Sequence, residues 1–227
     1  MIFKEIKIYL QNVCKNNFLI NIILKTHFDF DIIFIQKLLW SVIQSILSSI
    51  NYKEDILIGV PNHPSWTVFS RCSLQANNFP QVITYINIRL SSLWFSLWNN
   101  VLNHKDILCI SFLNHSLSYF LINIYSDSSQ LALKYLKNTE VNIGNILILT
   151  GDFNIWDSFW DLSFLHHSSH RDILFELADS FSIELSRPIE YFPTRYSNNA
   201  QDSDLVLDLI FLHSNSREID NHCIHPE

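Results

Sequence analysis

The sequence predicts an α+β protein in which two β-sheets pack face to face and helices cover the outside. Short runs of β-branched and aromatic residues outnumber the helical patterns, and the helical patterns interrupt them without strict alternation. One of these runs, 146–149, is continuously apolar, which is typical of a strand covered on both faces. The 227 residues show no internal repeat or linker, so we expect a single domain over 1–227.

Eight segments are predicted to be strands because each is short, apolar and bounded by Asn, Asp, Ser or His. They are 6–10, 31–35, 57–60, 82–90, 107–112, 119–125, 145–150 and 207–212. The segment 82–90 alternates in part, as a half-buried strand would.

Apolar residues at helical spacing predict three helices between these strands, over 16–27, 128–141 and 170–180. Ser169, followed three residues later by Asp172, resembles a capping box at the start of the third helix.

Charge neither supports nor excludes a nucleic-acid function. The formal net charge is −7, from 15 Lys and Arg against 22 Asp and Glu, and no run of basic residues occurs. Phosphate contacts usually require a basic stripe, but a phosphodiesterase can carry its carboxylates in one metal-binding site.

The four cysteines, Cys14, Cys72, Cys109 and Cys223, are far apart and form no CxxC pair, so we interpret them as small apolar fillers in a reducing compartment. The N-terminus carries charged residues without a long uncharged core behind them, unlike a signal peptide. The apolar stretch 18–24 is too short to span a bilayer. The sequence therefore predicts a soluble, intracellular protein, nuclear or cytoplasmic, with no membrane partner.

The strongest local motif is Gly-Asp-Phe-Asn (151–154), directly after an apolar strand. A carboxylate at a sheet edge, with an amide two residues later on the same side, suits water activation beside a metal ion. Gly, Asp and Asn are also turn formers, so the motif alone is equally compatible with a plain turn.

Two other strand ends favour the catalytic interpretation. The first strand ends in Gln11-Asn12 and the second in Gln36-Lys37. The order strand–Asn, helix, strand–Gln-X, several strands and strand–Gly-Asp-Phe-Asn resembles the endonuclease/exonuclease/phosphatase superfamily. The strings that carry the resemblance are Tyr-Leu-Gln-Asn-Val (9–13), Asp-Ile-Ile-Phe-Ile-Gln (31–36), Asn-Ile-Tyr-Ser (123–126), Gly-Asp-Phe-Asn-Ile (151–155) and Val-Leu-Asp-Leu-Ile-Phe (206–211). Together they look most like the endonuclease domain of fungal LINE-type (non-LTR) retrotransposons.

The resemblance implies a four-layer α/β/β/α sandwich of two mixed sheets, with Mg²⁺ as cofactor and DNA as partner. It also implies an original fusion to a reverse transcriptase. It assigns Asp152 and Asn154 to the nucleophilic water, Tyr125 to the scissile phosphate and Asp208 to orienting a histidine or the metal. Further positions that it places in the site are Asn12 and Asp152 at the metal and Thr194 at the DNA. Trp156 lies two residues after Asn154, so we also expect it at the rim of the site, in contact with the substrate.

Two departures from the family pattern predict a weak or inactive enzyme. Lys37 stands where the family has a metal-binding Glu, so an ammonium replaces an oxygen ligand. The sequence also ends before the Ser-Asp-His strand of the family could appear. We therefore expect the strand at 207–212 to lack one neighbour and to present an open edge.

Three functions are compatible with these observations. They are a phosphodiesterase fold descended from a DNA-nicking endonuclease and now impaired, a working phosphatase or nuclease of the same superfamily, and a binding module that uses the sandwich as a scaffold. The cluster His166, His167 and His170 is interpreted as a polar loop and helix start. Asp157, Asp161 and Asp172 are expected to be solvated. Most tryptophans are expected in the core, with Trp156 as the exception.

Overall fold

The computed structural model describes residues 6–38, 61–71, 80–98, 102–114, 116–139, 144–161, 165–186 and 208–213, and the backbone of 44–47 and 56–59. The elements, in chain order, are β1 (Ile8–Asn12), α1 (Asn17–Thr26), β2 (Ile32–Gln36), β3 (Gln44–Leu47), β4 (Ile56–Gly59), β5 (Trp66–Phe69), β6 (Val82–Asn87), the 3-10 turn Ile88–Leu90, β7 (Phe95–Leu97), β8 (Ile107–Asn114), β9 (Leu117–Tyr125), α2 (Leu131–Asn138), β10 (Ile146–Asp152), α3 (Ser169–Phe181), β11 (Ile183–Leu185) and β12 (Asp208–His213).

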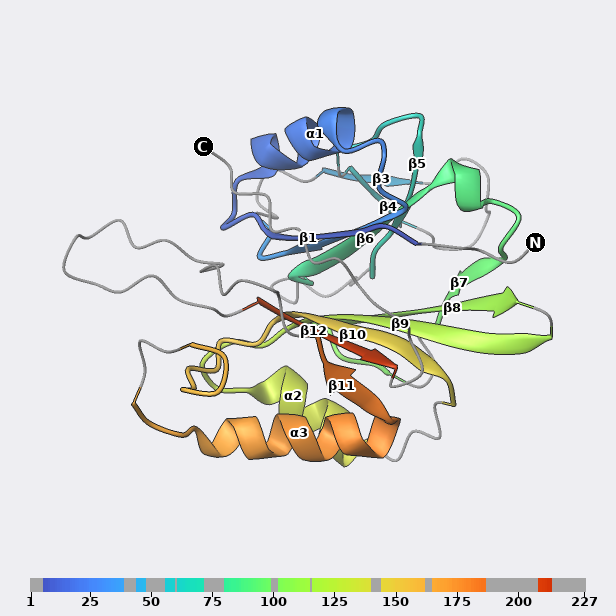
Figure 1. Ribbon diagram of the computed structural model, residues 1–227. Helices are drawn as coiled ribbons and strands as arrows, with labels where there is room; N and C mark the ends of the chain where they lie inside the picture. Colours follow the sequence, from blue (N-terminus) through green and yellow to red (C-terminus); the bar gives the residue numbers. More distant parts are fainter. Residues whose placement is uncertain are drawn as a thin grey trace.

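Two mixed sheets form the centre of the molecule. The first has the order β1-β2-β6-β5, and the second has the order β11-β12-β10-β9-β8-β7. The pairs β1–β2 and β9–β10 are parallel, and the other neighbours in these two sheets are antiparallel. Helix α1 covers the first sheet, and α2 and α3 cover the second (Figure 1). The predicted four-layer α/β/β/α sandwich is therefore confirmed.

Three apolar clusters fill the spaces between the four layers. Side chains from β2 and β6 meet side chains from β8, β9 and β10 between the sheets, with Phe34, Ile110 and Ile148 among them. Alternate residues of the first sheet, such as Ile33 and Tyr85, pack against α1. Helices α2 and α3 cover the outer face of the second sheet. Both faces of β2 and β6 are covered, so the expectation that 82–90 is half-buried was wrong.

Local sequence explains where the helices begin and end. The Asn16 side chain accepts hydrogen bonds from the N–H groups of Phe18 and Leu19, which caps the start of α1. At α3 the N-cap is Ser168, not the predicted Ser169, because the Ser168 side chain accepts from the N–H of His170. The helices predicted over 16–27, 128–141 and 170–180 are all confirmed, with shorter bounds for the second.

All eight predicted strands occur, but two predictions about them were wrong. The segment 82–90 ends as a strand at Asn87, whose side chain accepts from the N–H of Arg89 and starts the 3-10 turn. The strand at 208–213 does not lack a neighbour, because β10 pairs with one edge along Asp208–Leu212 and β11 pairs with the other edge at Phe211–His213. Strand β11, which the sequence did not predict, supplies that second neighbour. Strands β3, β5 and β7 were also missed because each is only three or four residues long.

Gly151 is required where β10 approaches β9 most closely. Its φ is 149°, in the region that L side chains rarely adopt, and an added Cβ would lie 1.8 Å from the carbonyl oxygen of Ile124. At Gly144, by contrast, no heavy atom lies within 4 Å of such a Cβ.

We therefore expect Gly151→Ala to lower the free energy of unfolding by about 3 kcal/mol or more, because steric overlap and backbone strain add together. For a domain of this size each kcal/mol corresponds to about 2–4 °C in Tm. Thermal unfolding of Gly151→Ala beside Gly144→Ala measures the difference. Equal Tm values for the two variants would contradict the close approach of β10 to β9.

Candidate active site

One end of the sandwich gathers the polar side chains that follow or end several strands. The register pairs Asp152 with Tyr125 on one side and with Asp208 on the other. Side chains at paired positions project to the same face of a sheet. That face is the inner one, because Ile148, four residues before Asp152 on β10, packs between the sheets. Asp152, Tyr125 and Asp208 therefore project toward the first sheet.

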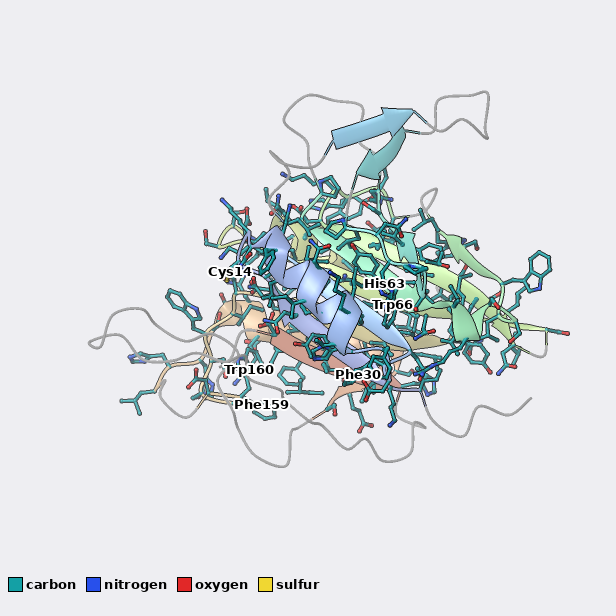
Figure 2. The ribbon with its side chains drawn as sticks, turned by 90° about the horizontal axis from the view of Figure 1, so that it is seen from above. Cys14, Phe30, His63, Trp66, Phe159 and Trp160 are labelled. Atoms are coloured by element: carbon teal, nitrogen blue, oxygen red, sulfur yellow. The ribbon has the colours of Figure 1, made fainter. Side chains whose placement is uncertain are left out.

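Asn12 reaches Asp152 from the first sheet. The Asn12 Nδ2 donates a 2.6 Å hydrogen bond to Asp152 Oδ2, and Asn12 Oδ1 accepts a 2.9 Å bond from the Cys14 N–H. Cys14 lies near the start of α1 in Figure 2 and is exposed, so it is not the apolar filler that we expected. Asp152 is only 1% exposed, so this bond fixes a buried carboxylate to the opposite sheet.

Asn154 is held in the left-handed region, with φ 47°, just after β10. Its backbone N–H donates a 3.0 Å bond to Asp152 Oδ1, and its Nδ2 donates a 2.7 Å bond to the Ser126 carbonyl oxygen. Asn154 and Asp152 thus belong to one hydrogen-bonded turn. The motif is therefore a turn, and this turn also holds both residues at this end of the sandwich.

Ser126 and Gln130 support this turn, and the sequence reasoning missed both. Gln130 is buried with φ 58°, and its Nε2 donates to the carbonyl oxygens of Phe153 and Asn154 at 2.8 and 3.2 Å. Ser126 Oγ donates a 2.8 Å bond to Gln130 Oε1. In the sequence, Gln130 is only a glutamine just before a predicted helix. Nothing there distinguishes a buried, hydrogen-bonded glutamine from a solvated one.

A second buried polar pair ties the sheets together behind Asp152. Gln36 and Asn123 are both fully buried, and Gln36 Nε2 donates a 2.7 Å bond to Asn123 Oδ1. Asn123 Nδ2 donates in turn to the carbonyl oxygen of Ile83 at 3.0 Å. The strings that carry the resemblance contain both residues, but nothing in the sequence indicated that they contact each other.

Tyr125 and Asp106 lie side by side at this end, because the Tyr125 N–H donates a 2.9 Å bond to the Asp106 carbonyl oxygen. Burial raises the pKa of Tyr125 to about 12, and nearby carboxylates, that of Asp152 first among them, add to the shift. The phenol is therefore protonated at neutral pH and can donate a hydrogen bond. Burial likewise raises the pKa of Asp106 to about 6, against the opposing effects of Lys105 and the Gln81 N–H.

Lys37 follows β2 with φ 58°, and its backbone is held by two bonds of 2.7 Å, from its own N–H to the Gln81 carbonyl oxygen and from the Lys15 N–H to its own carbonyl oxygen. Its ammonium makes no ion pair with any described carboxylate. A contact in which the Lys37 ammonium takes the place of the metal ion on a carboxylate is therefore not seen among the described residues. The Oδ2 atom of Asp152 instead accepts a hydrogen bond from the Asn12 side-chain amide.

The loop after Asn154 is packed more tightly than its sequence suggested. Asp157 and Asp161 are buried, so only Asp172 of the three expected solvated acids is exposed. Asp157 accepts from the N–H groups of Phe159 and Ser168 at 2.8 and 2.7 Å. Burial opposes ionisation of Asp157, but these backbone bonds and Arg171 outweigh it and lower the pKa of Asp157.

The tryptophans were expected in the core except for Trp156, and this expectation is confirmed for some of them only. Trp66 and Trp160 are buried, and Trp160 lies beside Phe159 in Figure 2, whereas Trp94 is 80% exposed and Trp156 53% exposed. His170 lies in the first turn of α3, and His167 Nδ1 contacts Arg171. Thr194 lies outside the described residues.

The described residues do not fit the metal site that the resemblance implies. Mg²⁺ prefers oxygen ligands, and carboxylates above all. Here Lys37 stands at the position where the resemblance implies a carboxylate ligand, and Asn12 directs an amide N–H at Asp152. Within the described residues no three His, Cys, Asp or Glu side chains cluster in a way that could hold a metal ion.

None of the helices in the described part of the chain has the length and apolar character that a membrane crossing requires.

Comparison with solved structures shows that these two packed mixed sheets with helices outside have the endonuclease/exonuclease/phosphatase fold. The endonuclease domain of TRAS1, a telomere-specific non-LTR retrotransposon, superposes with a TM-score of 0.65 at 13% identity, over 92% of this chain and 86% of that one. No protein-family model matches the chain, and no curated protein matches its sequence.

Two bacterial structures show the same fold at greater distance. An endonuclease/exonuclease/phosphatase family protein from Leptotrichia buccalis has a TM-score of 0.54 at 13% identity, over 91% of this chain and 87% of that one. A β-hairpin deletion mutant of beta toxin from Staphylococcus aureus has a TM-score of 0.51 at 8% identity, over 98% and 93%. These likenesses establish the fold, and the roles of the individual site residues stay predictions.

Asp106 gives the site a testable pH dependence. Its folded pKa of about 6 lies above the ordinary 3.8, so folding favours the protonated form. The stability that this carboxyl contributes is fully present below about pH 4 and is lost as pH rises through about 6. We expect Asp106→Asn, which keeps an acceptor for Gln81, to stabilise the fold by at most about 3 kcal/mol near pH 8 and to have little effect near pH 4.

Thermal unfolding at both pH values measures this difference. Asp179→Asn, at an exposed position on α3, is the matched control for removal of one negative charge, because Asp179 is not among the groups that shift the pKa of Asp106. A stabilisation of Asp106→Asn that does not depend on pH would show that Asp106 is not the titrating group.

Proposed function

We propose that this chain is a phosphodiesterase-fold domain that derives from a retrotransposon DNA-nicking endonuclease and has little or no hydrolytic activity. The observation that carries the proposal is the contrast within one site. Asn12, Tyr125, Asp152 and Asp208 occupy inward positions at one end of the sandwich, while Lys37 stands where a carboxylate would have to bind a cation. The likeness to the TRAS1 endonuclease domain supports the nucleic-acid class of the ancestor.

The remaining groups suit binding of a DNA phosphate better than its hydrolysis. Tyr125 keeps its proton at neutral pH, because its pKa is raised to about 12, and it can donate to a phosphate oxygen. The Lys37 ammonium is not neutralised by a described carboxylate, so it can attract the same anion. The two carboxylate oxygens of Asp152 accept hydrogen bonds from the Asn12 amide and the Asn154 N–H, and these bonds hold the turn in place.

Mg²⁺ would meet repulsion at Lys37. One unit charge about 4 Å from another contributes about 4 kcal/mol at an effective dielectric of about 20, and the divalent ion doubles this upper bound. Replacing the ammonium by a carboxylate removes the repulsion and adds an oxygen ligand.

We expect Lys37→Glu to raise the affinity for Mg²⁺ or Mn²⁺ by at least about tenfold, which needs only about 1.4 kcal/mol. Calorimetric titration of both forms measures it. Lys15→Glu is the matched control, because Lys15 is exposed, has a positive φ of 68° and changes the net charge equally. Equal affinities for the two variants would mean that the Lys37 side chain points away from the site.

Nicking of supercoiled plasmid separates this proposal from its two alternatives. The unmodified chain is expected to nick no faster than Asp152→Ala in the presence of Mg²⁺, and to retard the plasmid in a binding assay. Metal-dependent nicking that Asp152→Ala abolishes would identify a working enzyme of the same fold. Absence of both nicking and DNA binding would favour a module for another ligand.

A further inference from the structure

We propose that β7 is a self-association edge, at which two copies of this chain pair their β7 strands antiparallel and join their six-stranded sheets into one. This inference goes beyond the proposed function and does not depend on it. Strand β7 is separated from β10, which carries Asp152, by β8 and β9, so pairing at β7 and DNA binding at the candidate site can each fail separately.

The outer edge of β7 offers backbone groups to a partner. β7 is the last strand in its sheet, and no described strand lies beyond it (Figure 1). The Trp98 N–H donates a 2.9 Å bond to the Cys109 carbonyl oxygen on β8. Because bonding residues alternate along an antiparallel ladder, Ser96 also bonds toward β8, whereas Phe95 and Leu97 direct their N–H and C=O groups away from it. No hydrogen bond to these outward groups occurs among the described residues.

This edge has none of the features that normally prevent strand pairing. Residues 90–103 contain no Asp, Glu, Lys, Arg or Pro, and the run 93–98 is apolar or aromatic at every position except Ser96. Natural edge strands are usually protected by charged side chains, by Pro or by bulges, and an apolar edge without them tends to pair with another chain. Trp94, directly before β7, is 80% exposed, so the apolar surface is open to solvent.

A second copy fits this edge because the edge is complementary to itself. A two-fold axis at Ser96 pairs Phe95 with Leu97 of the second copy, and Leu97 with Phe95 of the second copy, so the outward backbone groups of both strands find partners. The same axis places Trp94 opposite Trp98 of the second copy. An exposed indole thereby gains an aromatic neighbour.

The same pairing extends the apolar row between the sheets. The ring of Phe95 lies beside Phe69 of β5 and Phe112 of β8, with centroids 6.4 and 5.3 Å away. Leu97 packs against the same inter-sheet cluster. Placing Phe95 opposite Leu97 of the second copy therefore continues the cluster of one copy into the cluster of the other.

Charge favours a second copy at this edge. Two copies that each carry a net charge of −7 repel each other, and they can approach most easily through a surface without charged side chains. Residues 90–103 supply such a surface. A contact about a two-fold axis uses the same surface on both copies and is complete with two, so association ends at a dimer. Because β7 has only three residues, the interface is small and the dimer belongs to the weak, transient class.

Sedimentation velocity of the full chain, over a concentration series that reaches about 100 µM, tests for such a weak dimer. The unmodified chain is expected to change from monomer to dimer as its concentration rises. Ser96→Lys should raise the dissociation constant at least about tenfold, because the two-fold axis places two like charges directly opposite each other. Ser180→Lys, at an exposed position on α3, is the matched control for the added charge.

An equimolar mixture of Ser96→Lys and Ser96→Glu distinguishes a lost contact from a damaged fold. Each variant alone should stay monomeric at concentrations where the unmodified chain dimerises. The mixture should form a heterodimer, because opposite charges then lie across the axis. Thermal unfolding of each variant at low concentration establishes that the monomer is folded.

A cysteine at position 96 tests the register. Two residues 96 related by the axis form a non-hydrogen-bonded pair, whose Cα atoms lie about 4.5 Å apart. A disulfide requires a Cα separation of about 4.4–6.8 Å. Mild oxidation should therefore cross-link Ser96→Cys into dimers faster than Ser180→Cys, and faster than the unmodified chain, whose Cys14 is also exposed.

Truncation of single aromatic side chains locates the contact surface. Trp94→Ala should weaken the dimer by about tenfold, because each dimer contains two Trp94–Trp98 contacts. Phe18→Ala is the matched control, since Phe18 is an aromatic residue that is 72% exposed on α1, away from β7. Thr67→Lys, on the exposed side of β5, adds a charge to the neighbouring sheet edge and should weaken the dimer less than Ser96→Lys.

Four results would overturn the proposal. A chain that stays monomeric throughout the series does not pair with itself at β7, and the edge is then open to a strand of another protein. A dimer that Phe18→Ala weakens and Ser96→Lys does not would lie on α1. Growth beyond two copies would contradict the two-fold contact. Cross-linking of Ser96→Cys no faster than that of Ser180→Cys would contradict the register. None of these results bears on DNA binding, so the proposed function stands or fails by its own test.

Discussion

The two sheets are held together by the apolar side chains of their inner faces, and the same alternation of side chains places the polar groups of the site. Along β10, Ile148 packs in the inter-sheet core and Asp152 follows on the same face two pleats later. The inward row on β9 likewise passes from Leu121 through Asn123 to Tyr125. Since a strand changes face at every residue, a shift of register by one position would turn the site outward and the core into solvent.

Three polar contacts fix the position of one sheet relative to the other, which apolar packing alone defines less strictly. Asn12 bonds to Asp152, Gln36 bonds to Asn123, and the Gln81 N–H bonds to Asp106. The first two contacts join a strand of the first sheet to a strand of the second. The third joins the residue before β6 to the residue before β8, at the same end of the sandwich. Buried polar groups are costly unless they are paired, so these contacts disfavour any sliding of one sheet over the other. The sandwich is therefore most precisely defined where the candidate site lies.

In the proposed function, the fold is retained while its original chemistry is lost. The scaffold of Asp152, Asn154, Ser126 and Gln130 is hydrogen-bonded within itself and needs no cation to form. In that proposal, Lys37 in place of the family's Glu changes the side-chain charge at this position by two units, while the Lys37 backbone makes its own hydrogen bonds. A fold can therefore persist after its original reaction is lost, and function has to be argued from the site.

The sequence by itself determined the layers, most of the elements and the strand ends where the polar groups lie. Long apolar runs and helical spacing are local signals, so β2, β6, β8, β9, β10 and all three helices were predictable. The short strands β5, β7 and β11 were not, because three or four residues become a strand only when a neighbouring strand supplies hydrogen bonds.

Only the tertiary structure decided which side chains meet. Asp157 reads as a surface acid until Ser168 and Phe159 bring their N–H groups to it, and Gln130 reads as a solvated amide until the turn after β10 folds over it. The Asn12–Asp152 contact joins residues 140 positions apart. Such pairings depend on the packing of distant segments, which no local pattern encodes, so the sequence specified the candidate residues and the fold specified their partners.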